Sequence, residues 1–535
     1  MIGGGDEGSY IACGKLLSER FGFVFEDEVA KFGTKYLPVS SFATPAFRRL
    51  EQPGPTLQVV SGWNKGFAFI SIPFWWLDAD AGWKYVSPLA GALSLITLFL
   101  IGARLHNTLV GLIAALLLGS NFLQLWFSRY PMTEVLSQSL LLLMFLSLLE
   151  HHRRASAKWA LSFSGLSSLA LFVHFGNAPL WLVMAGIMSL TVMPVKTLNL
   201  PSEESCSRPR RMTAFSFDST RVRKFLSVGL LTLGLPSTFA TAYWLSDPGI
   251  QRYTRLGKKM ADSTGQLDTL VATFLTRVEN LALFIPLAVW FLIPVGIFVI
   301  TRDRSMRRWQ WFLLIGLAVT SFAIIACAGV GTPRVLYVAR RNVPFVLPAI
   351  CLICARALDW VASALSRFSG GRIAVGAAIA YLVGFQLYAF APVSKVDQGK
   401  GTPQLASRVR AELVASGSLS SALVIVPHGA VSFVSGMRWV YGIPIVTYSE
   451  ALTPMVIESM LNDGLRLYSV DLTESVRHPG ALFRALETFP NIQQKFITSR
   501  DLYWTHINPI DPTLFPAITD RVFARGGLYR ITKKG

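Results

Sequence analysis

The stretch TLVGLIAALLLGSNFLQLWFSRYPMTEVLSQSLLLLMFLSLL, residues 108–149, decides the fold class. It contains two apolar runs, near 108–126 and 131–149, that meet at the string FSRYPMTE (127–134). A helix needs about twenty mostly apolar residues to cross a membrane. Two such runs joined by a short polar turn therefore predict two neighbouring membrane spans.

The rest of the chain has the same character. Of its 535 residues, 52% are hydrophobic and 15% are charged, and the mean hydropathy is +0.46. A soluble protein carries about a quarter charged residues, so these values exclude an ordinary soluble enzyme and a disordered chain. We predict a polytopic α-helical membrane protein with about ten spans, near 86–103, 108–126, 131–149, 159–175, 178–194, 225–245, 280–300, 310–329, 343–362 and 373–391.

The positive charges orient these spans. The formal net charge is +19, but Lys and Arg collect in short loops rather than in one folded basic region, so we expect no nucleic-acid partner. One alternate set of loops holds seventeen Lys and Arg and the other holds nine, and the richer set should be cytoplasmic. We therefore expect a multi-pass protein of the inner (plasma) membrane, with residues 1–85 and the C-terminal tail on the outer face.

Three regions follow from this topology: a first outer loop (1–85), a multi-span domain (86–391) and a soluble extracytoplasmic domain (392–535). An 85-residue segment must reach the outer side with only Met1 and Ile2 before its first glycines. We expect a first transmembrane helix upstream of Met1, which would make eleven spans; the alternative is a truncated gene.

The first outer loop opens with an acidic pair, Asp6 and Glu7. Asp6 is placed to cap a helix, and the helical spacing of Tyr10, Cys13 and Leu17 predicts an amphipathic helix along the membrane surface. Two carboxylates at the outer face also suit a site that abstracts a proton. The simpler alternative is an ordinary capped helix.

The order of these features resembles the GT-C superfamily of membrane glycosyltransferases, in particular its protein O-mannosyltransferase-like and aminoarabinose-transferase-like branch. The acidic pair opens the first outer loop, FSRYPMTE leads into a span, and a basic pair (Arg340 and Arg341) precedes a late Pro-containing span. The resemblance covers roughly residues 3–391, without the family's first helix.

The resemblance implies a sugar donor linked to a polyprenyl phosphate, acting on the outer face. It implies that Asp6, with Glu7 beside it, is the catalytic base. Inverting transfer needs a carboxylate to take the acceptor's proton, while the phosphate leaving group needs cations more than a general acid. The resemblance leaves the use of a divalent cation open, and the sequence has no cluster with recognisable zinc spacing.

Six further residues are candidates for substrate contacts. Arg334, Arg340 and Arg341 match the family position that contacts the lipid phosphate, and arginine suits phosphate oxygens; the alternative is interfacial anchoring. Arg129 and Glu134 flank an outer turn where the family often binds acceptor, sugar or metal, and His174 ends a span on the same side. The alternative for Arg129 is an interfacial cation, and that for Glu134 is a charge in the first turn of a helix. The alternative for His174 is a polar helix cap.

The tail predicts a small α/β domain, because strands and helices alternate in it. We expect helices at 404–415 and 450–462, strands at 422–426, 443–447 and 465–470, and a hairpin at 522–531 around Arg525-Gly526-Gly527.

The leading hypothesis is a glycosyltransferase that moves a single sugar from a polyprenyl-phosphate donor to a glycan, lipid or protein acceptor. The alternative is a non-enzymatic membrane protein such as a transporter or lipid-glycan flippase.

Overall fold

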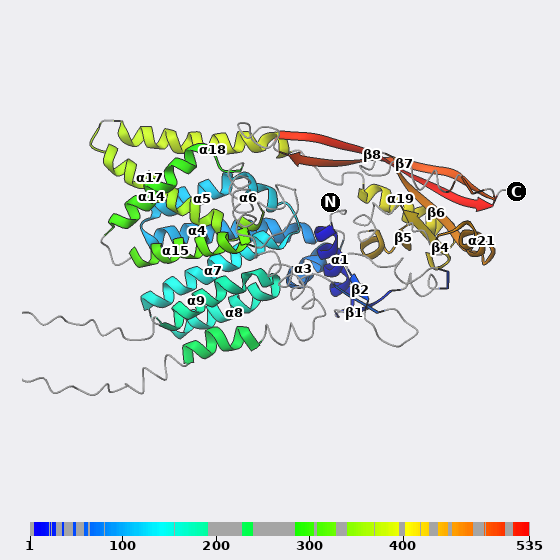
Figure 1. Ribbon diagram of the computed structural model, residues 1–535, viewed down its shortest axis with the longest axis horizontal. Helices are drawn as coiled ribbons and strands as arrows, with labels where there is room; N and C mark the ends of the chain where they lie inside the picture. The colour runs from blue at the N-terminus through cyan, green and yellow to red at the C-terminus, as the bar shows by residue number, and fades with distance from the viewer. Residues whose placement is uncertain are drawn as a thin grey trace, which may run out of the picture.

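The computed structural model describes most of the helical region and most of the C-terminal domain. The residues that it describes are 5–20, 22, 24–27, 35–36, 47–49, 58–61, 65–79, 81–154, 156–190, 227–238, 284–303, 308–327, 340–368, 370–394, 402–417, 419–426, 437–447, 452–473, 486, 488–489, 491–508 and 517–533. In Figure 1 the helices from α4 to α18 form one half of an elongated molecule and the α/β domain forms the other half, with α1, α3 and the short strands β1 and β2 between them.

The helical half has a helix in each of the ten predicted ranges. Their bounds are α4 (Trp83–Leu105), α5 (Thr108–Ser120), α6 (Phe122–Phe127), α7 (Thr133–Arg154), α8 (Ala157–Val173), α9 (Ala178–Leu190), residues 227–238 with a π-helical turn η3 (Leu230–Gly234), α14 (Leu287–Arg302), α15 (Arg308–Cys327), α17 (Val346–Leu365) and α18 (Gly371–Ser394).

One predicted span is two helices. Asn121 ends α5 and begins α6, and its side chain accepts a hydrogen bond from the Leu123 amide. An Asn at this position satisfies an amide that the start of a helix otherwise leaves unbonded. The apolar run 108–126 therefore turns at Asn121 instead of continuing as a single helix.

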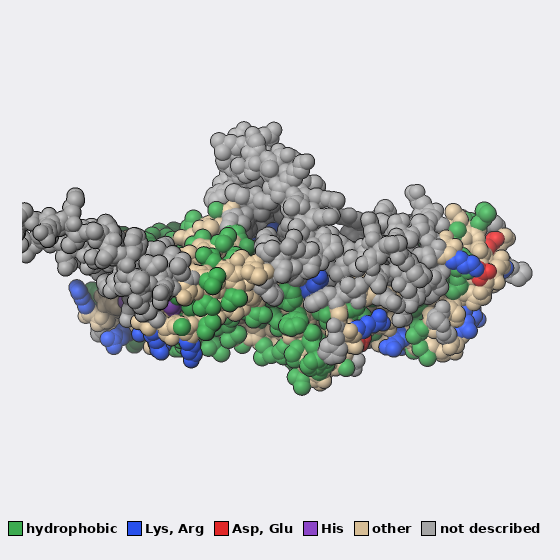
Figure 2. All heavy atoms as spheres, turned by 90° about the horizontal axis from the view of Figure 1, so that it is seen from below, with side chains coloured by type: hydrophobic (Ala, Val, Ile, Leu, Met, Phe, Trp, Pro, Cys, Tyr) green, Lys and Arg blue, Asp and Glu red, His purple; other side chains and the backbone are tan. Residues whose placement is uncertain are grey.

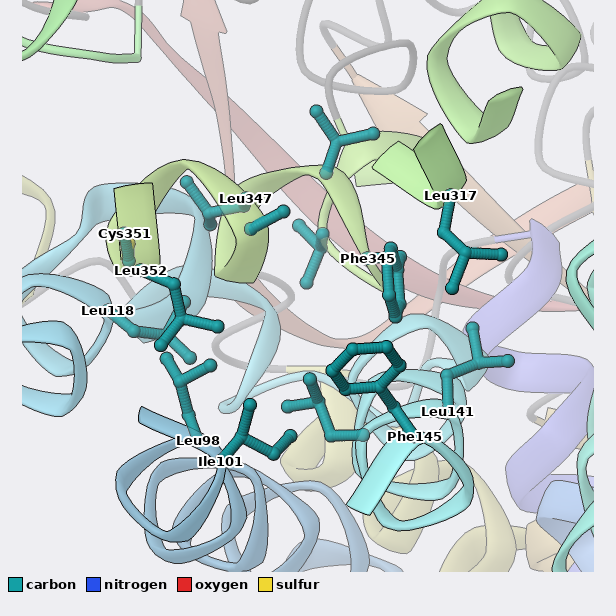
Figure 3. Close-up of a cluster of buried hydrophobic side chains, with 14 of the residues drawn as sticks. Leu98, Ile101, Leu118, Leu141, Phe145, Leu317, Phe345, Leu347, Cys351 and Leu352 are labelled. Atoms are coloured by element: carbon teal, nitrogen blue, oxygen red, sulfur yellow. The ribbon is translucent and has the colours of Figure 1, made fainter. Parts of the chain in front are cut away.

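The helices pack through small residues and a common apolar core. A Cβ atom built on Gly102 of α4 would lie 2.6 Å from the Cα of Gly111 on α5, so the two backbones touch, as membrane helices commonly do. Deeper in the bundle, Phe145 of α7 meets Phe345 edge to face, with ring centroids 6.0 Å apart. Figure 3 shows this pair among leucines from α4, α5, α7, α15 and α17.

The N-terminal segment forms a small platform at one end of the bundle. Strands β1 (Val24–Glu26), β3 (Gln58–Ser61) and β2 (Phe47–Arg49) make an antiparallel sheet in the order β1-β3-β2. Helix α1 (Gly5–Arg20) lies against α3 (Gly66–Leu77). A Cβ atom on Gly14 would lie 2.4 Å from Ser71 Oγ, so α1 crosses α3 at close range.

The setting of α1 differs from the membrane-surface helix that the apolar spacing predicts. Its side chains from Ser9 to Leu17 are buried on nearly every side, with Lys15 half-buried. Ile11, Leu16 and Leu17 pack in one cluster with Trp75 of α3 and Val440 of the C-terminal domain. The helix is enclosed because α3 and the C-terminal domain cover it from different sides.

The C-terminal domain has a five-stranded sheet in the order β5-β4-β6-β8-β7. Strands β4 (Ala422–Val426), β5 (Ile445–Thr447) and β6 (Arg466–Thr473) are parallel, while β7 (Ile492–Asn508) and β8 (Ala517–Lys533) are antiparallel. Helix α19 (Thr402–Ala415) covers one face of the sheet and α21 (Pro454–Asn462) covers the other, because alternate residues of β4 fall into two separate clusters.

The hairpin predicted at 522–531 is wrong. Gly526 and Gly527 lie within the single long strand β8, where Gly527 pairs with Asp471 of β6 on one side and with Ser499 of β7 on the other. A glycine pair inside a strand marks a close approach of neighbouring backbones as readily as it marks a turn. The true hairpin partner of β8 is β7.

Candidate functional site

The end of the bundle that faces α1 holds a buried ion pair. Glu134 lies in the first turn of α7, where the helix dipole favours a carboxylate. Its Oε1 atom is 3.1 Å from Nε of Arg340, and the two side chains are 10% and 7% exposed. The sequence singles out both residues, and the structure brings them into contact.

Arg340 lies in the short 3₁₀ turn η4 (Arg340–Asn342). The chain just after this turn is hydrogen-bonded to α7. Gln138 lies one turn beyond Glu134, and its Nε2 atom donates a hydrogen bond of 2.6 Å to the carbonyl of Val343. Arg340 Nη1 also lies 3.6 Å from the sulfur of Met132 in the string FSRYPMTE. These contacts place the guanidinium beside the turn that enters α7.

The start of α3 and the end of α8 meet in the same region. The Nδ2 atom of Asn177 donates to Ser137 Oγ of α7 at 3.3 Å and to the carbonyl of Ala170 at 2.8 Å. A Cβ on Gly66 would lie 2.5 Å from the backbone of Val173, next to His174. His174 terminates α8, and its Nδ1 atom accepts a hydrogen bond from the Gly176 amide at 3.0 Å, as the polar-cap interpretation requires.

Helix α1 reaches this region through its first half. The rings of Tyr10 and Phe67 have centroids 5.5 Å apart, which joins α1 to the start of α3. Asp6 and Glu7 lie in the first turn of α1, one turn before Tyr10, and their side chains lie outside the described residues. The acidic turn of α1 and the Glu134–Arg340 pair are thus at the same end of the helical bundle.

Comparisons with known proteins give the fold a name. No protein-family model and no curated protein matches the sequence. The crystal structure of the Archaeoglobus fulgidus oligosaccharyltransferase in complex with Zn and sulfate is similar, with a TM-score of 0.50 and 11% identity over 88% of this chain and 64% of that chain. That enzyme belongs to the GT-C superfamily. The chain has the GT-C fold.

Similarity to ArnT from Cupriavidus metallidurans bound to undecaprenyl phosphate extends over 98% of this chain and 94% of that chain, at 11% identity and a TM-score of 0.49. The chain spans just under two thirds of the oligosaccharyltransferase. The likeness to the oligosaccharyltransferase, at 11% identity, establishes the fold alone, and the GT-C resemblance predicted from the motif order is confirmed at that level.

The GT-C fold and the apolar helices identify a multi-pass membrane protein. Four described helices are long and apolar enough to cross a membrane: Trp83–Leu105, Thr133–Arg154, Val346–Leu365 and Gly371–Tyr388. Shorter apolar helices accompany them. Figure 2 shows a broad hydrophobic surface over the helical half, with Lys and Arg side chains at the end away from the α/β domain.

The basic end of the GT-C bundle has its own buried carboxylate. Glu150, whose side chain is 3% exposed, lies 2.5 Å from Arg104 Nε, 3.0 Å from Arg154 Nε and 3.4 Å from Arg153 Nη1. Nearby, Arg356 pairs with Asp359 at 3.1 Å, as their spacing on one helix predicts. These groups lie at the opposite end of α7 from Glu134.

The remaining predicted residues are more scattered. Arg129 is exposed, and its guanidinium carbon is 6.0 Å from the ring centroid of Phe390 on α18. Arg341 is half-buried beside Arg340, and Arg334 lies outside the described residues. Within the described part of the chain, no group of three His, Cys, Asp or Glu residues is arranged to hold a metal ion.

Two buried amides beside the ion pair, those of Gln138 and Asn342, were not predicted from the sequence. Asn342 is 1% exposed, and neither of its amide atoms has a hydrogen-bond partner among the described residues. The same holds for Oε1 of the fully buried Gln138 and for Oε2 of Glu134. Their positions in the sequence could have indicated them, because Gln138 follows Glu134 by one helical turn and Asn342 directly follows the basic pair Arg340 and Arg341.

Proposed function

We propose that the chain is a glycosyltransferase of the inner membrane that moves a single sugar from a polyprenyl-phosphate donor to an acceptor on the outer face. The observation that carries the proposal is the buried Glu134–Arg340 pair, with atoms 3.1 Å apart, at the end of a GT-C bundle where the acidic turn of α1 also lies. Basic side chains at the other end support a cytoplasmic position for that end, and with it an outer position for the α/β domain.

The proposed roles follow from the chemistry. Asp6, with Glu7 beside it, takes the proton of the acceptor while the acceptor's heteroatom forms a bond to the anomeric carbon. The bond from that carbon to the phosphate oxygen breaks, and the polyprenyl phosphate leaves with the bonding electrons. Arg340, with Arg341 and Arg334 close to it in sequence, stabilises the negative charge that develops on the phosphate.

Glu134 and the buried amides have a second role in this proposal. Carboxylates and amides are the groups that bind sugar hydroxyls, since they accept and donate hydrogen bonds in fixed directions. Glu134 Oε2, Gln138 Oε1 and the Asn342 amide all keep hydrogen-bonding capacity within the described residues. Arg129 and His174 complete the proposed contacts to substrate from the rim. None of these steps is routed through a metal ion.

The test uses release of polyprenyl phosphate as its readout. Purified protein in nanodiscs is given a panel of polyprenyl-phosphate sugars and candidate acceptors, and wild type is compared with Asp6→Asn and Glu7→Gln. Loss of a general base costs about 10²–10⁴-fold, so Asp6→Asn should fall by that factor while Glu7→Gln falls less.

The outcome that contradicts the proposal is equally specific. If Asp6→Asn releases polyprenyl phosphate as fast as wild type, then Asp6 is not the base. If the wild type moves a labelled lipid-linked sugar across a vesicle membrane without releasing polyprenyl phosphate, then the protein is a flippase and not a transferase.

A further inference from the structure

A second buried ion pair joins segments that are 411 residues apart in the sequence. Asp27 directly follows β1 of the first outer loop, and its Oδ1 atom accepts a hydrogen bond from Nη2 of Arg438 in the C-terminal domain. The two side chains are 3% and 2% exposed. Burial lowers the pKa of the Arg438 guanidinium, and the adjacent Asp27 carboxylate raises it, so each charge is tolerated there because of the other.

The same segment of the C-terminal domain covers α1. Lys15, near the middle of α1, donates a hydrogen bond from Nζ to the carbonyl of Val440 at 2.7 Å. The Val440 side chain is 5% exposed and belongs to one apolar cluster with Ile11 and Leu16 of α1. Residues 437–441, which we call the clamp segment, therefore contact both the helix that carries Asp6 and the strand that precedes Asp27.

A peripheral contact between the same two regions differs in kind. Lys35 Nζ lies 2.6 Å from Asp463 Oδ2, but these side chains are 67% and 38% exposed. Exposed ion pairs contribute little because water and salt screen them, whereas removal of one partner from a buried pair leaves an uncompensated charge without water. Lys35 and Asp463 thus provide a matched control on the same interface.

We propose that the C-terminal domain is a clamp that fixes α1 and its acidic turn against the helical bundle, with Arg438 and Asp27 as positioning residues. The clamp segment packs on the face of α1 next to the one that meets α3, because Lys15 and Ile11 contact the clamp segment while Gly14 contacts α3. Helix α1 is thus fixed by both the membrane helices and the soluble domain. The consequence for catalysis rests on the proposed function, while the placement of α1 does not.

The experiment measures the placement of α1 directly. Backbone hydrogen exchange by mass spectrometry is followed on the full chain in detergent, over peptides from α1 and, as an internal reference, from α7. Arg438→Met and Asp27→Asn should each raise exchange in α1 by about tenfold or more, with α7 unchanged. Lys35→Ala and Asp463→Asn should leave both helices unchanged.

A second variant and a second measurement keep the test decisive if Arg438→Met does not fold. Lys15→Met removes one hydrogen bond to the clamp segment and should raise α1 exchange by a smaller factor. In addition, a protease site placed between Ser394 and Thr402 allows cleavage after folding, and size-exclusion chromatography then shows whether the C-terminal fragment stays with the helices. It should stay in the wild type and in Lys35→Ala, and dissociate more in Asp27→Asn.

The activity arm separates the two proposals. If the clamp positions the base, Asp27→Asn should lower kcat for release of polyprenyl phosphate and leave KM for the donor unchanged. Faster α1 exchange in a protein whose wild type shows no transfer would support the clamp and contradict the proposed function. Unchanged α1 exchange and full retention of the cleaved fragment in both Asp27→Asn and Lys15→Met would overturn the clamp.

Discussion

Arg340 Nε lies 3.1 Å from Glu134 Oε1, and each side chain is about nine-tenths buried. The pair joins the turn before α17 to the first turn of α7, within the end of the bundle that also receives α1. An arginine held by one carboxylate is pre-organised for a second anion, because its fork of donors is already fixed in direction. The same carboxylate opposes the arrival of a phosphate, since both are negative.

This opposition predicts the effect of Glu134→Gln on lipid binding. The Gln side chain is isosteric with Glu, but it carries no charge and no longer neutralises the guanidinium 3.1 Å away. If the chain is the transferase proposed above, a polyprenyl phosphate should bind Glu134→Gln about tenfold more tightly, an effect of about 1–2 kcal/mol, and Arg340→Met more weakly. Equilibrium binding of undecaprenyl phosphate in nanodiscs measures both, and weaker binding in Glu134→Gln would show that the carboxylate supports the phosphate.

The pair also makes a prediction about stability. Arg340→Met leaves the Glu134 carboxylate buried without its partner, which should lower the free energy of unfolding by about 3–5 kcal/mol. The double variant Glu134→Leu/Arg340→Met removes both charges and should be less destabilised than the sum of the single changes. Unfolding in mixed micelles supplies the four values, and strict additivity would mean that the two charges do not interact.

Glu150 provides a test at the other end of α7. Its side chain is more deeply buried than that of Glu134 and is surrounded by Arg104, Arg153 and Arg154. Glu150→Gln should lower the free energy of unfolding by only about 1 kcal/mol or less, because the three arginines are exposed enough for water to screen them. Binding of undecaprenyl phosphate by the folded fraction should not change. A change in that binding would show that the two ends of α7 are coupled.

Two glycines test whether α1 must lie close to α3. A Cβ on Gly14 would lie 2.4 Å from Ser71 Oγ and 2.8 Å from Trp75 Nε1, whereas a Cβ on Gly165 of α8 meets nothing within 4 Å. Gly14→Ala should therefore destabilise the protein by about 1–3 kcal/mol. Gly165→Ala should stabilise it by about 0.5–1 kcal/mol through helix propensity. Thermal unfolding of the two variants in one detergent compares them directly, and equal shifts would contradict the close crossing.

Local pattern was sufficient for much of the fold. The apolar runs predicted where the helices lie, because a span must satisfy its own backbone, and β4 was predicted at Ala422–Val426 with the bounds that the structure gives it. Arg356 and Asp359 lie three residues apart on one helix, a spacing that brings two side chains together. These features depend on residues that are near each other in the sequence.

Contacts between distant segments were not predictable in the same way. The sequence marked Glu134 and Arg340 separately, but nothing local indicates that they touch. Burial of α1 depends on Val440, which lies in the last quarter of the chain. The same reason explains the error at Gly526-Gly527, since a glycine pair predicts a turn unless the neighbouring strands are known.

Asn342 gives a prediction in which stability and function change in opposite directions. Its amide is 1% exposed and finds no hydrogen-bond partner within the described residues. Replacement of an unsatisfied buried polar group by an apolar group of similar shape is nearly neutral or stabilising, so Asn342→Leu should leave the melting temperature unchanged or raise it. If the amide binds a sugar hydroxyl, transfer should still fall by about 10–100-fold, the cost of one or two lost hydrogen bonds to substrate.

The matched control for Asn342 is Asn177, which is 4% exposed and has an amide that donates to Ser137 Oγ and to the Ala170 carbonyl. Asn177→Leu removes both hydrogen bonds, each of which contributes about 0.5–1.5 kcal/mol, so it should lower the free energy of unfolding by about 1–3 kcal/mol. Thermal unfolding and transfer are measured on both variants. A group reserved for a ligand is dispensable for stability and required for activity. Lower stability together with unchanged transfer in Asn342→Leu would therefore mean that this amide supports the fold and takes no part in binding.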